Sequence, residues 1–320
     1  MKKILIGISS EINNKFILKL KKLIKNKRIT FKIINKNETD KERLKQLINV
    51  DIFITKYLML PKKFFKMKNN LKLLQLTTAD YSFINLNEYK KYSFKIANNC
   101  GSNAVSVSEH IFLLMLVIYR NFIDQFIIKK KKWNNLKMHN QELYKKKIGI
   151  IGMGNIGFEL AKRCNSFGMD VFYYDIKRKS KILEKRNKLN YLSAKKLFKN
   201  CDFISLNMSL NNRSEKLVSL KLLNTMKKHS VIINTSRGKI LKNNDIYKVL
   251  QKRKIFFGAL DVFELEPLPL NSNLRSLKNI IMTPHCGPSR ESYDRLSKII
   301  ATNIQSIYQK KNLKNLKGLI

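Results

Sequence analysis

With 320 residues, 44% of them hydrophobic, the chain can bury the cores of about two domains. Its formal net charge of +43 makes nucleic acid, acidic membranes and small anions the partners to consider, but the lysines are spread along most of the chain, as in "KLKKLIKNKR" (19–28) and "KKKK" (129–132). This spread indicates solvated lysine faces with weak, salt-sensitive anion binding, and it argues against specific nucleic-acid recognition, which would gather basic and aromatic residues in one patch.

Short apolar runs alternate with amphipathic stretches, in one series before residue 100 and a second from residue 147. The runs predict strands and the stretches, such as 12–26 and 39–49, predict helices, an alternation typical of parallel βαβ units. No long linker rich in proline or glycine separates the series, so we expect an α/β fold of two closely packed domains, each a doubly wound parallel sheet. The predicted strands are residues 4–8, 31–34, 51–55, 71–76 and 94–98, then 147–152, 170–175, 202–207, 231–236, 256–263 and 280–284.

A long helix is predicted from about Asn103 into the "KKKK" stretch, and an amphipathic helix over about 289–310 follows the last strand. The segment "IFLLMLVIY" (111–119) is apolar on more than one face, which is typical of a helix that is deeply buried or lies at an interface. Because this run stops at Arg120, well short of the roughly 20 residues that span a membrane, we predict no membrane partner.

The cysteines and the N-terminus bear on metal binding and location. No CxxC or other metal-ligand spacing joins Cys100, Cys164, Cys201 and Cys286, so we predict neither a metal site nor a disulfide framework. Scattered cysteines are typical of a reducing compartment, and the apolar run at 4–8 is too short for a signal peptide. The sequence therefore predicts a cytoplasmic protein.

The segment "KIGIIGMGNIG" carries a predicted strand into a Gly-x-Gly-x-x-Gly turn. Gly152 permits the tight turn, Gly154 lets a pyrophosphate approach the backbone, and Gly157 lets the next helix pack on the strand. The motif alone also occurs in ordinary strand–helix turns, but the following strand ends in Asp175, whose carboxylate would accept hydrogen bonds from the adenosine ribose. That carboxylate would repel a 2′-phosphate, so we predict NAD as the cofactor, a preference that the basic residues 177–179 could soften. The predicted NAD-binding residues of this segment are Gly152, Gly154, Asn155, Ile156, Gly157 and Asp175.

Three further segments follow strands of the second series, at the sheet edge where doubly wound folds place their ligands. "INTSRGK" carries Arg237, "ALDVFELEP" carries Asp261 and Glu266, and "MTPHCG" carries His285. A guanidinium can bind a carboxylate through two hydrogen bonds, and a histidine held by a carboxylate can protonate the alkoxide that forms when a hydride reaches a carbonyl. Singly, these residues could be a strand-end ion pair, loop acids and a core histidine. Together they predict interconversion of a 2-oxo acid and a 2-hydroxy acid.

These motifs make the sequence resemble the D-isomer-specific 2-hydroxyacid dehydrogenases over nearly the whole chain. The matching segments are "NAVSVSEH" (103–110), "ELYKKKIGIIGMGNIG" (142–157), "INTSRG" (233–238), "ALDVFELEP" (259–267) and "TPH" (283–285). By position, the resemblance implies that Arg237 binds the substrate carboxylate, that His285 is the acid/base and that Glu266 pairs with it. It also implies contacts with the cofactor from Thr235, Ser236, Asp261 and His285.

The resemblance further implies a domain order. A Rossmann NAD-binding domain, residues 100–287, would be inserted into a discontinuous flavodoxin-like substrate-binding domain, residues 1–99 plus 288–320. The long helix after Asn103 would link the two domains and contribute to a homodimer interface. We expect no additional C-terminal regulatory domain.

The chain departs from the family's pattern near the expected substrate. The family's carboxylate-binding loop is usually rich in glycine, but here it reads "QLTTADYS", with Thr78, Ala79 and Asp80 as the predicted substrate-binding residues. Asp80 could repel an anion, or it could recognise a substrate hydroxyl or amine. Asn207 and Ser209 stand where His-x-Pro is common beside the cofactor. These changes keep the reaction type and leave the identity of the acid open.

The sequence therefore predicts an NAD-dependent oxidoreductase that interconverts a small D-2-hydroxy acid and its 2-oxo acid. The alternative is a protein that keeps the fold and senses NAD(H) without turnover, which the altered loop at 77–82 would favour. Oxidation of NADH by any 2-oxo acid would separate the two.

Overall fold

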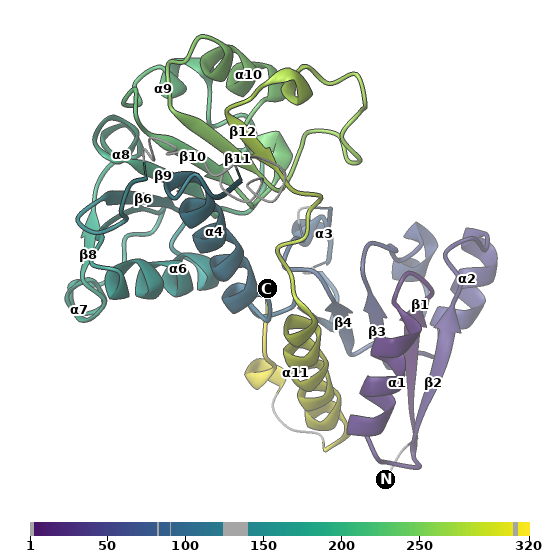
Figure 1. The fold of residues 1–320 in the computed structure, drawn as a ribbon. Coiled ribbons are helices and arrows are strands. Elements are labelled where there is room, and N and C mark those ends of the chain that lie inside the picture. Colours follow the sequence, from purple (N-terminus) through teal and green to yellow (C-terminus); the bar gives the residue numbers. More distant parts are fainter. Residues whose placement is uncertain (1–2, 82, 90, 124–139, 310–312) are drawn as a thin grey trace, which may run out of the picture. The chain divides into compact units, whose positions relative to one another are not determined.

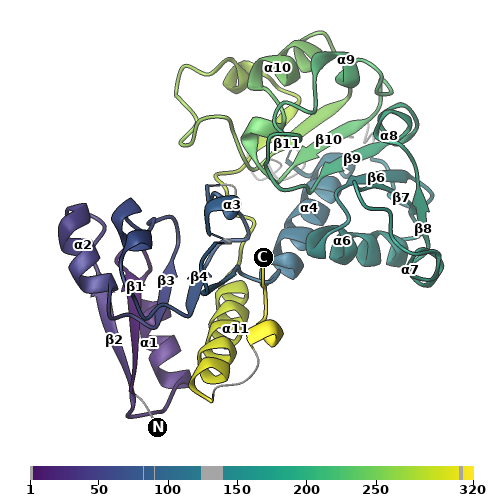
Figure 2. The ribbon, with the colours of Figure 1, turned by 180° about the vertical axis from the view of Figure 1, so that it is seen from behind.

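The computed structural model describes residues 3–320 apart from 82, 90, 124–139 and 310–312. The chain divides into two compact units, one comprising Met1–Asn103 with Arg290–Ile320 and the other comprising Ala104–Ser289 (Figures 1 and 2). The first unit is thus discontinuous in sequence. The boundaries between the two units lie at 103/104 and 289/290, whereas the sequence predicted them at 99/100 and 287/288.

The first unit is built on a five-stranded parallel sheet in the order β2-β1-β3-β4-β5, which is the flavodoxin-like order. Its central strands are buried on both faces, which explains why they are nearly continuous apolar runs in the sequence. The strands are β1 (Ile4–Ser9), β2 (Ile29–Ile34), β3 (Ile52–Thr55), β4 (Leu73–Leu76) and β5 (Lys95–Ala97).

Helices cover both faces of this sheet. On one face α1 (Asn14–Leu23) and α11 (Arg290–Tyr308) lie side by side and share an apolar core with β1 and β3 (Figures 1 and 2). The other face is covered by α2 (Asp40–Leu47), η1 (Lys62–Lys66) and α3 (Leu86–Tyr89). Side-chain caps set the helix starts: Thr39 and Glu42 form a capping box at α2. The C-terminal helix is therefore an integral part of the first unit's core.

The second unit is built on a seven-stranded parallel sheet in the order β12-β11-β10-β9-β6-β7-β8. If β6 is counted as the first strand, the order read from β8 is that of dinucleotide-binding folds, with β12 added as a further strand at the edge. The strands are β6 (Lys147–Ile151), β7 (Asp170–Tyr174), β8 (Leu189–Tyr191), β9 (Phe203–Leu206), β10 (Val231–Asn234), β11 (Phe257–Leu260) and β12 (Ile280–Met282).

Helices also cover both faces of the second sheet. One face packs against α4 (Ala104–Tyr119) and α6 (Asn155–Ser166), and the other packs against α8 (Ala194–Asn200), α9 (Leu220–Leu223) and α10 (Asn243–Gln251). A short helix, α7 (Lys181–Arg186), joins β7 to β8. The prediction of two doubly wound parallel sheets is therefore confirmed.

Two elements differ from the prediction. The strand β8 was missed, because "LNY" is too short to form an apolar run. The predicted long helix was wrong at Arg120: α4 ends at Tyr119, and Asn121 adopts a φ of +49°, which an α-helix does not accommodate. The "KKKK" stretch lies outside the described residues. No helix within the described ranges is long and apolar enough to cross a membrane.

Candidate active site

The carboxyl ends of all seven strands of the second sheet meet at one edge, because every strand pair is parallel. Loops at this edge carry all the predicted cofactor-binding and catalytic residues of the second unit. The remaining predicted residues follow β4 in the first unit. In chain order, the residues at the second unit's edge are Gly152 to Gly157 after β6, Asp175 after β7, Thr235 to Arg237 after β10, Asp261 and Glu266 after β11, and His285 after β12.

The loop after β6 has the form of a phosphate cradle. Gly152 has a φ of +98°, and a Cβ added there would lie 2.9 Å from the backbone of Asn207. A Cβ on Gly157 would lie 2.4 Å from the carbonyl oxygen of Gly152, so helix and turn touch closely. A Cβ on Gly154 would meet no atom within 4 Å, and α6 begins at Asn155 without a side-chain cap. These observations fit a pyrophosphate bound by the first N–H groups of α6.

Two polar side chains at this edge of the sheet also fit a dinucleotide. Asp175 Oδ2 accepts a hydrogen bond from the Met153 backbone N–H at 2.8 Å, which holds the carboxylate beside the glycine turn. The Thr235 hydroxyl is buried and finds no hydrogen-bond partner within the described chain. A buried hydroxyl of this kind is costly unless a ligand satisfies it.

The turn after β10 positions Arg237. The buried Asn234 side chain donates to the Arg237 carbonyl oxygen at 3.1 Å and accepts from the Ser236 hydroxyl at 2.7 Å. A Cβ on Gly238 would lie 1.9 Å from the backbone of Phe263, so only glycine lets this turn contact the loop after β11. Arg237 itself is half-buried, and its guanidinium donates to the Ser236 carbonyl oxygen at 2.7 Å. Neither Asn234 nor Gly238, which form the turn, was predicted as a site residue.

His285 and Glu266 form a contact pair at the same edge. His285 Nδ1 lies 2.8 Å from Glu266 Oε2, and Glu266 Oε1 accepts from the Phe263 backbone N–H at 3.0 Å. Glu264 instead accepts from the Asn243 backbone N–H at 2.6 Å. The backbone of His285 adopts a φ of +52°, a left-handed conformation that costs about 1–3 kcal/mol in a residue other than glycine. Such strain is typical of functional sites, where the surrounding structure maintains it.

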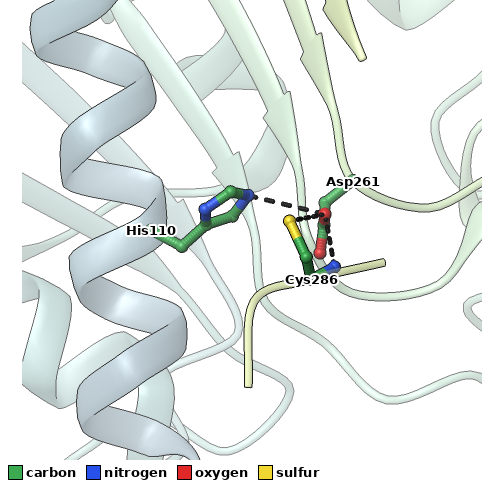
Figure 3. A group of neighbouring side chains, drawn as sticks. All are labelled: His110, Asp261 and Cys286. Carbon is green, nitrogen blue, oxygen red and sulfur yellow. Dashed lines mark hydrogen bonds and ion pairs between the residues drawn. The ribbon is translucent and has the colours of Figure 1, made fainter. Parts of the chain in front are cut away.

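A buried network anchors the histidine loop to β11 (Figure 3). Asp261 Oδ1 accepts from the Thr283 hydroxyl at 2.5 Å and from the Cys286 backbone N–H at 2.9 Å, and Oδ2 accepts from the Gly287 N–H at 3.1 Å. His110 reaches the network from α4, with Nε2 3.5 Å from Asp261 Oδ1 (Figure 3) and 3.1 Å from the Thr283 hydroxyl oxygen. Burial alone would raise the pKa of Asp261, but the hydrogen bonds from His110, Thr283 and the Cys286 N–H outweigh it and lower the pKa below its usual value.

The cluster also bears on the roles of Cys286 and of metal ions. The ligand atoms of His110, Asp261 and Cys286 lie within 4.8 Å of one another, close enough to share an ion, which the cysteine spacing did not predict. The Thr283 hydroxyl, however, bonds to both His110 and Asp261, so hydrogen bonding accounts for the cluster. Burial, together with the charge of Asp261, raises the pKa of the Cys286 thiol, which disfavours the nucleophilic thiolate.

The predicted substrate loop follows β4 in the first unit. The Thr78 hydroxyl donates to the Asp80 carbonyl oxygen at 2.7 Å, and the Asn98 side chain donates to the Ala79 carbonyl oxygen at 3.3 Å. At the neighbouring end of β3, Glu11 accepts from the backbone N–H groups of residues 57 and 58 at 3.0 and 2.9 Å. Hydrogen bonds thus hold the loop without the glycines that are usual in the family.

Comparison with known proteins agrees with this geometry. Residues 112–287 match the sequence profile of the NAD binding domain of the D-isomer specific 2-hydroxyacid dehydrogenases. The chain is 30% identical over 246 residues to a glyoxylate reductase from Korarchaeum cryptofilum, with 75% of this chain and 74% of that protein covered. It is 33% identical over 229 residues to a hydroxypyruvate reductase from Thermotoga maritima, with 71% and 74% covered.

Among solved structures, an acyclic imino acid reductase in complex with NADPH and D-Arg has a TM-score of 0.82 to this chain. The two sequences are 25% identical, and the match covers 99% of this chain and 100% of that one. The sequence match over more than half of the chain and the two curated relatives decide the assignment. The chain therefore belongs to the D-isomer specific 2-hydroxyacid dehydrogenases, a family of NAD-dependent oxidoreductases.

Proposed function

We propose that His285, Glu266 and Arg237 catalyse the reduction of a small 2-oxo acid to its D-2-hydroxy acid, and the reverse oxidation. The 2.8 Å contact between His285 Nδ1 and Glu266 Oε2 carries this proposal. Because Nδ1 is occupied by the carboxylate, Nε2 is the nitrogen left to exchange a proton with substrate. When bound, NADH would supply the hydride for the substrate carbonyl carbon.

Each of the three residues has a separate task. His285 donates its Nε2 proton to the carbonyl oxygen as negative charge develops there, and it takes the proton back in the oxidation. Glu266, fixed by the Phe263 N–H, orients the imidazole. Arg237 binds the substrate carboxylate through the two parallel N–H donors of its guanidinium, which also fixes the carbonyl in position.

The second unit offers the groups that would hold NAD. The uncapped start of α6 would bind the pyrophosphate, and Asp175 would accept from the adenosine ribose. On Asp261, Oδ1 receives most of the contacts in the described chain, whereas Oδ2 accepts from the Gly287 N–H. The remaining acceptor position of Oδ2 would accept from the nicotinamide carboxamide. Thr235, Ser236 and His285 complete the proposed cofactor contacts.

The first unit would bind substrate through the loop at Thr78, Ala79 and Asp80. Backbone N–H groups of this loop would meet the substrate carboxylate, and Asp80 would disfavour a second anionic group on the substrate. The curated relatives are a glyoxylate reductase and a hydroxypyruvate reductase, so small uncharged substituents on the 2-oxo acid are the first to consider.

The test is a panel of 2-oxo acids with NADH, comprising glyoxylate, hydroxypyruvate, pyruvate, 3-phosphohydroxypyruvate and bulkier acids. We expect saturable NADH oxidation with at least one small acid, because the site carries both a proton donor and a carboxylate-binding arginine. Tight NADH binding with no oxidation by any acid would favour the sensing alternative instead.

We also propose that the protein is a cytoplasmic homodimer. The helix α4 exposes Leu113, which is 55% accessible, and Phe112, Leu116 and Phe167 line an apolar hollow beside it. A second copy could cover this surface, and sedimentation equilibrium is expected to give twice the chain mass. A monomer at micromolar concentration would contradict the dimer.

The proposed cytoplasmic location is supported by the cysteines, because all four are free thiols, which fits a reducing compartment.

A further inference from the structure

The segment after Asp175 carries charge that a phosphate should attract. Lys177, Arg178 and Lys179 follow the acid after one residue, in the place where an arginine accommodates the ribose 2′-phosphate in NADP-binding folds. A guanidinium is well suited to bind a phosphate, because two of its N–H donors can meet two oxygens at once. From the sequence, Asp175 predicts NAD, and these basic residues could soften that preference.

The structure shows that Arg178 is already engaged. Its Nε donates to Glu184 Oε1 at 2.8 Å and its Nη2 donates to Glu184 Oε2 at 3.0 Å. The guanidinium carbon also lies 4.8 Å from the centre of the Tyr191 ring, the geometry of a cation–π contact. The paired donors that would bind a phosphate are thus committed to a carboxylate of the same unit.

Glu184 is placed to keep this pairing. It is 6% exposed, and it also accepts from the Tyr173 hydroxyl at 2.8 Å. The Tyr173 hydroxyl in turn accepts from the Lys179 backbone N–H at 2.9 Å, which fixes the path of the segment. The hydrogen bonds that Glu184 accepts from Arg178 lower the pKa of Glu184 to about 2, so this carboxylate stays charged at neutral pH. Withdrawing Arg178 would leave a buried carboxylate without its principal counter-charge, which is strongly unfavourable.

A second basic side chain of the segment is directed toward the acid. Lys179 Nζ lies 3.8 Å from Asp175 Oδ2 and 5.9 Å from the centre of the Phe158 ring.

We propose that Glu184 is a specificity-determining residue, which selects NAD over NADP by holding Arg178 away from the ribose 2′-position. This inference rests on the proposed position of the adenosine ribose at Asp175.

The test uses two probes that differ only by one phosphate, ADP-ribose and 2′-phospho-ADP-ribose, titrated calorimetrically against the whole chain. In Glu184→Gln the side chain keeps its size and its contact with Tyr173 but loses its charge. We expect this variant to bind 2′-phospho-ADP-ribose about tenfold tighter than the unmutated protein does, the gain of one charge-assisted hydrogen bond, with ADP-ribose affinity changed by less than about twofold. The ratio of kcat/KM for NADPH to that for NADH is expected to rise in parallel.

Three further variants identify the residue through which Glu184 acts. The gain should vanish in the double variant Glu184→Gln with Arg178→Ala, and Arg178→Ala alone should leave both affinities unchanged. Glu159→Gln is the matched control, because Glu159 forms a comparable pair with Arg163 on α6, 2.9 Å apart, and loses the same charge. It should leave both affinities unchanged.

Several outcomes would overturn the proposal. Equal changes in the affinities for the two probes, or a gain that persists without Arg178, would show that Glu184 does not act by restraining the guanidinium. If Glu184→Gln fails to fold, Arg178→Ala still decides: weaker binding of 2′-phospho-ADP-ribose by that single variant would show that Arg178 already serves the 2′-position. Absence of ADP-ribose binding by the unmutated chain would instead refute the proposed cofactor site.

Discussion

Replacement of His285 by asparagine is expected to lower kcat/KM for reduction of the 2-oxo acid by about 10²–10⁴-fold, the contribution typical of a general acid. Asparagine tolerates a left-handed backbone, so the φ of +52° at this position should be retained. Affinity for NADH, measured by fluorescence titration, should change far less, because His285 would be one of many cofactor contacts. Steady-state kinetics with the best acid of the panel provides the measurement.

The matched control is His229→Asn. His229 is also an exposed histidine beside a carboxylate, with Nε2 3.4 Å from Asp202 Oδ1, but it precedes β10 and so lies at the opposite edge of the sheet. Its replacement should leave kcat/KM unchanged. Glu266→Gln is expected to lower kcat/KM by about 10–100-fold, the usual effect of losing a partner that orients a histidine. Near-normal turnover by His285→Asn would refute the acid/base role.

Removal of the Arg237 guanidinium is expected to have the second large effect. Truncating one partner of a buried charge contact costs about 2–5 kcal/mol, so Arg237→Ala should lower kcat/KM by about 30- to 4,000-fold. Arg237→Lys keeps the charge but loses the paired donors, so its kcat/KM should lie between that of the unmutated protein and that of Arg237→Ala. The loss should be seen with 2-oxo acids and should not extend to NADH affinity.

Arg253→Lys serves as the control for the arginine series. Arg253 is exposed and precedes β11, which places it at the edge of the sheet opposite to Arg237. This conservative change should leave kcat/KM as it is. If Arg237→Ala retained near-normal kcat/KM with the preferred acid, another group would have to bind the carboxylate.

The strands were predictable because doubly wound sheets are buried on both faces. Ile52, Phe53 and Ile54 of β3 are fully buried, and such a run is apolar at every position rather than at alternate ones. The strand β8 lies at the edge of its sheet and pairs only with β7, so only Leu189 is buried in it and no apolar run marks it. Burial on both faces therefore explains why the central strands are apparent in the sequence, whereas the short edge strand β8 is not.

The candidate site was predictable where motifs are local and not where contacts depend on the fold. The resemblance of two local motifs to the family implied the contact between Glu266 and His285, which the structure shows at 2.8 Å. His110 was not named, because its contact with Thr283 spans 173 residues and forms only when α4 packs beside β11 and β12. The restraint of Arg178 by Glu184 was missed for another reason: the pairing is close in sequence, but a charged segment does not show which partner each side chain takes.

We infer that this chain reduces a 2-oxo acid to a single stereoisomer. The most direct measurement oxidises NADH with pyruvate or hydroxypyruvate and determines the configuration of the product by chiral chromatography. We expect one molecule of the D-2-hydroxy acid for each NADH consumed, with formation of this product largely lost in His285→Asn. Formation of the L-isomer, or unchanged product formation by His285→Asn, would contradict this expectation.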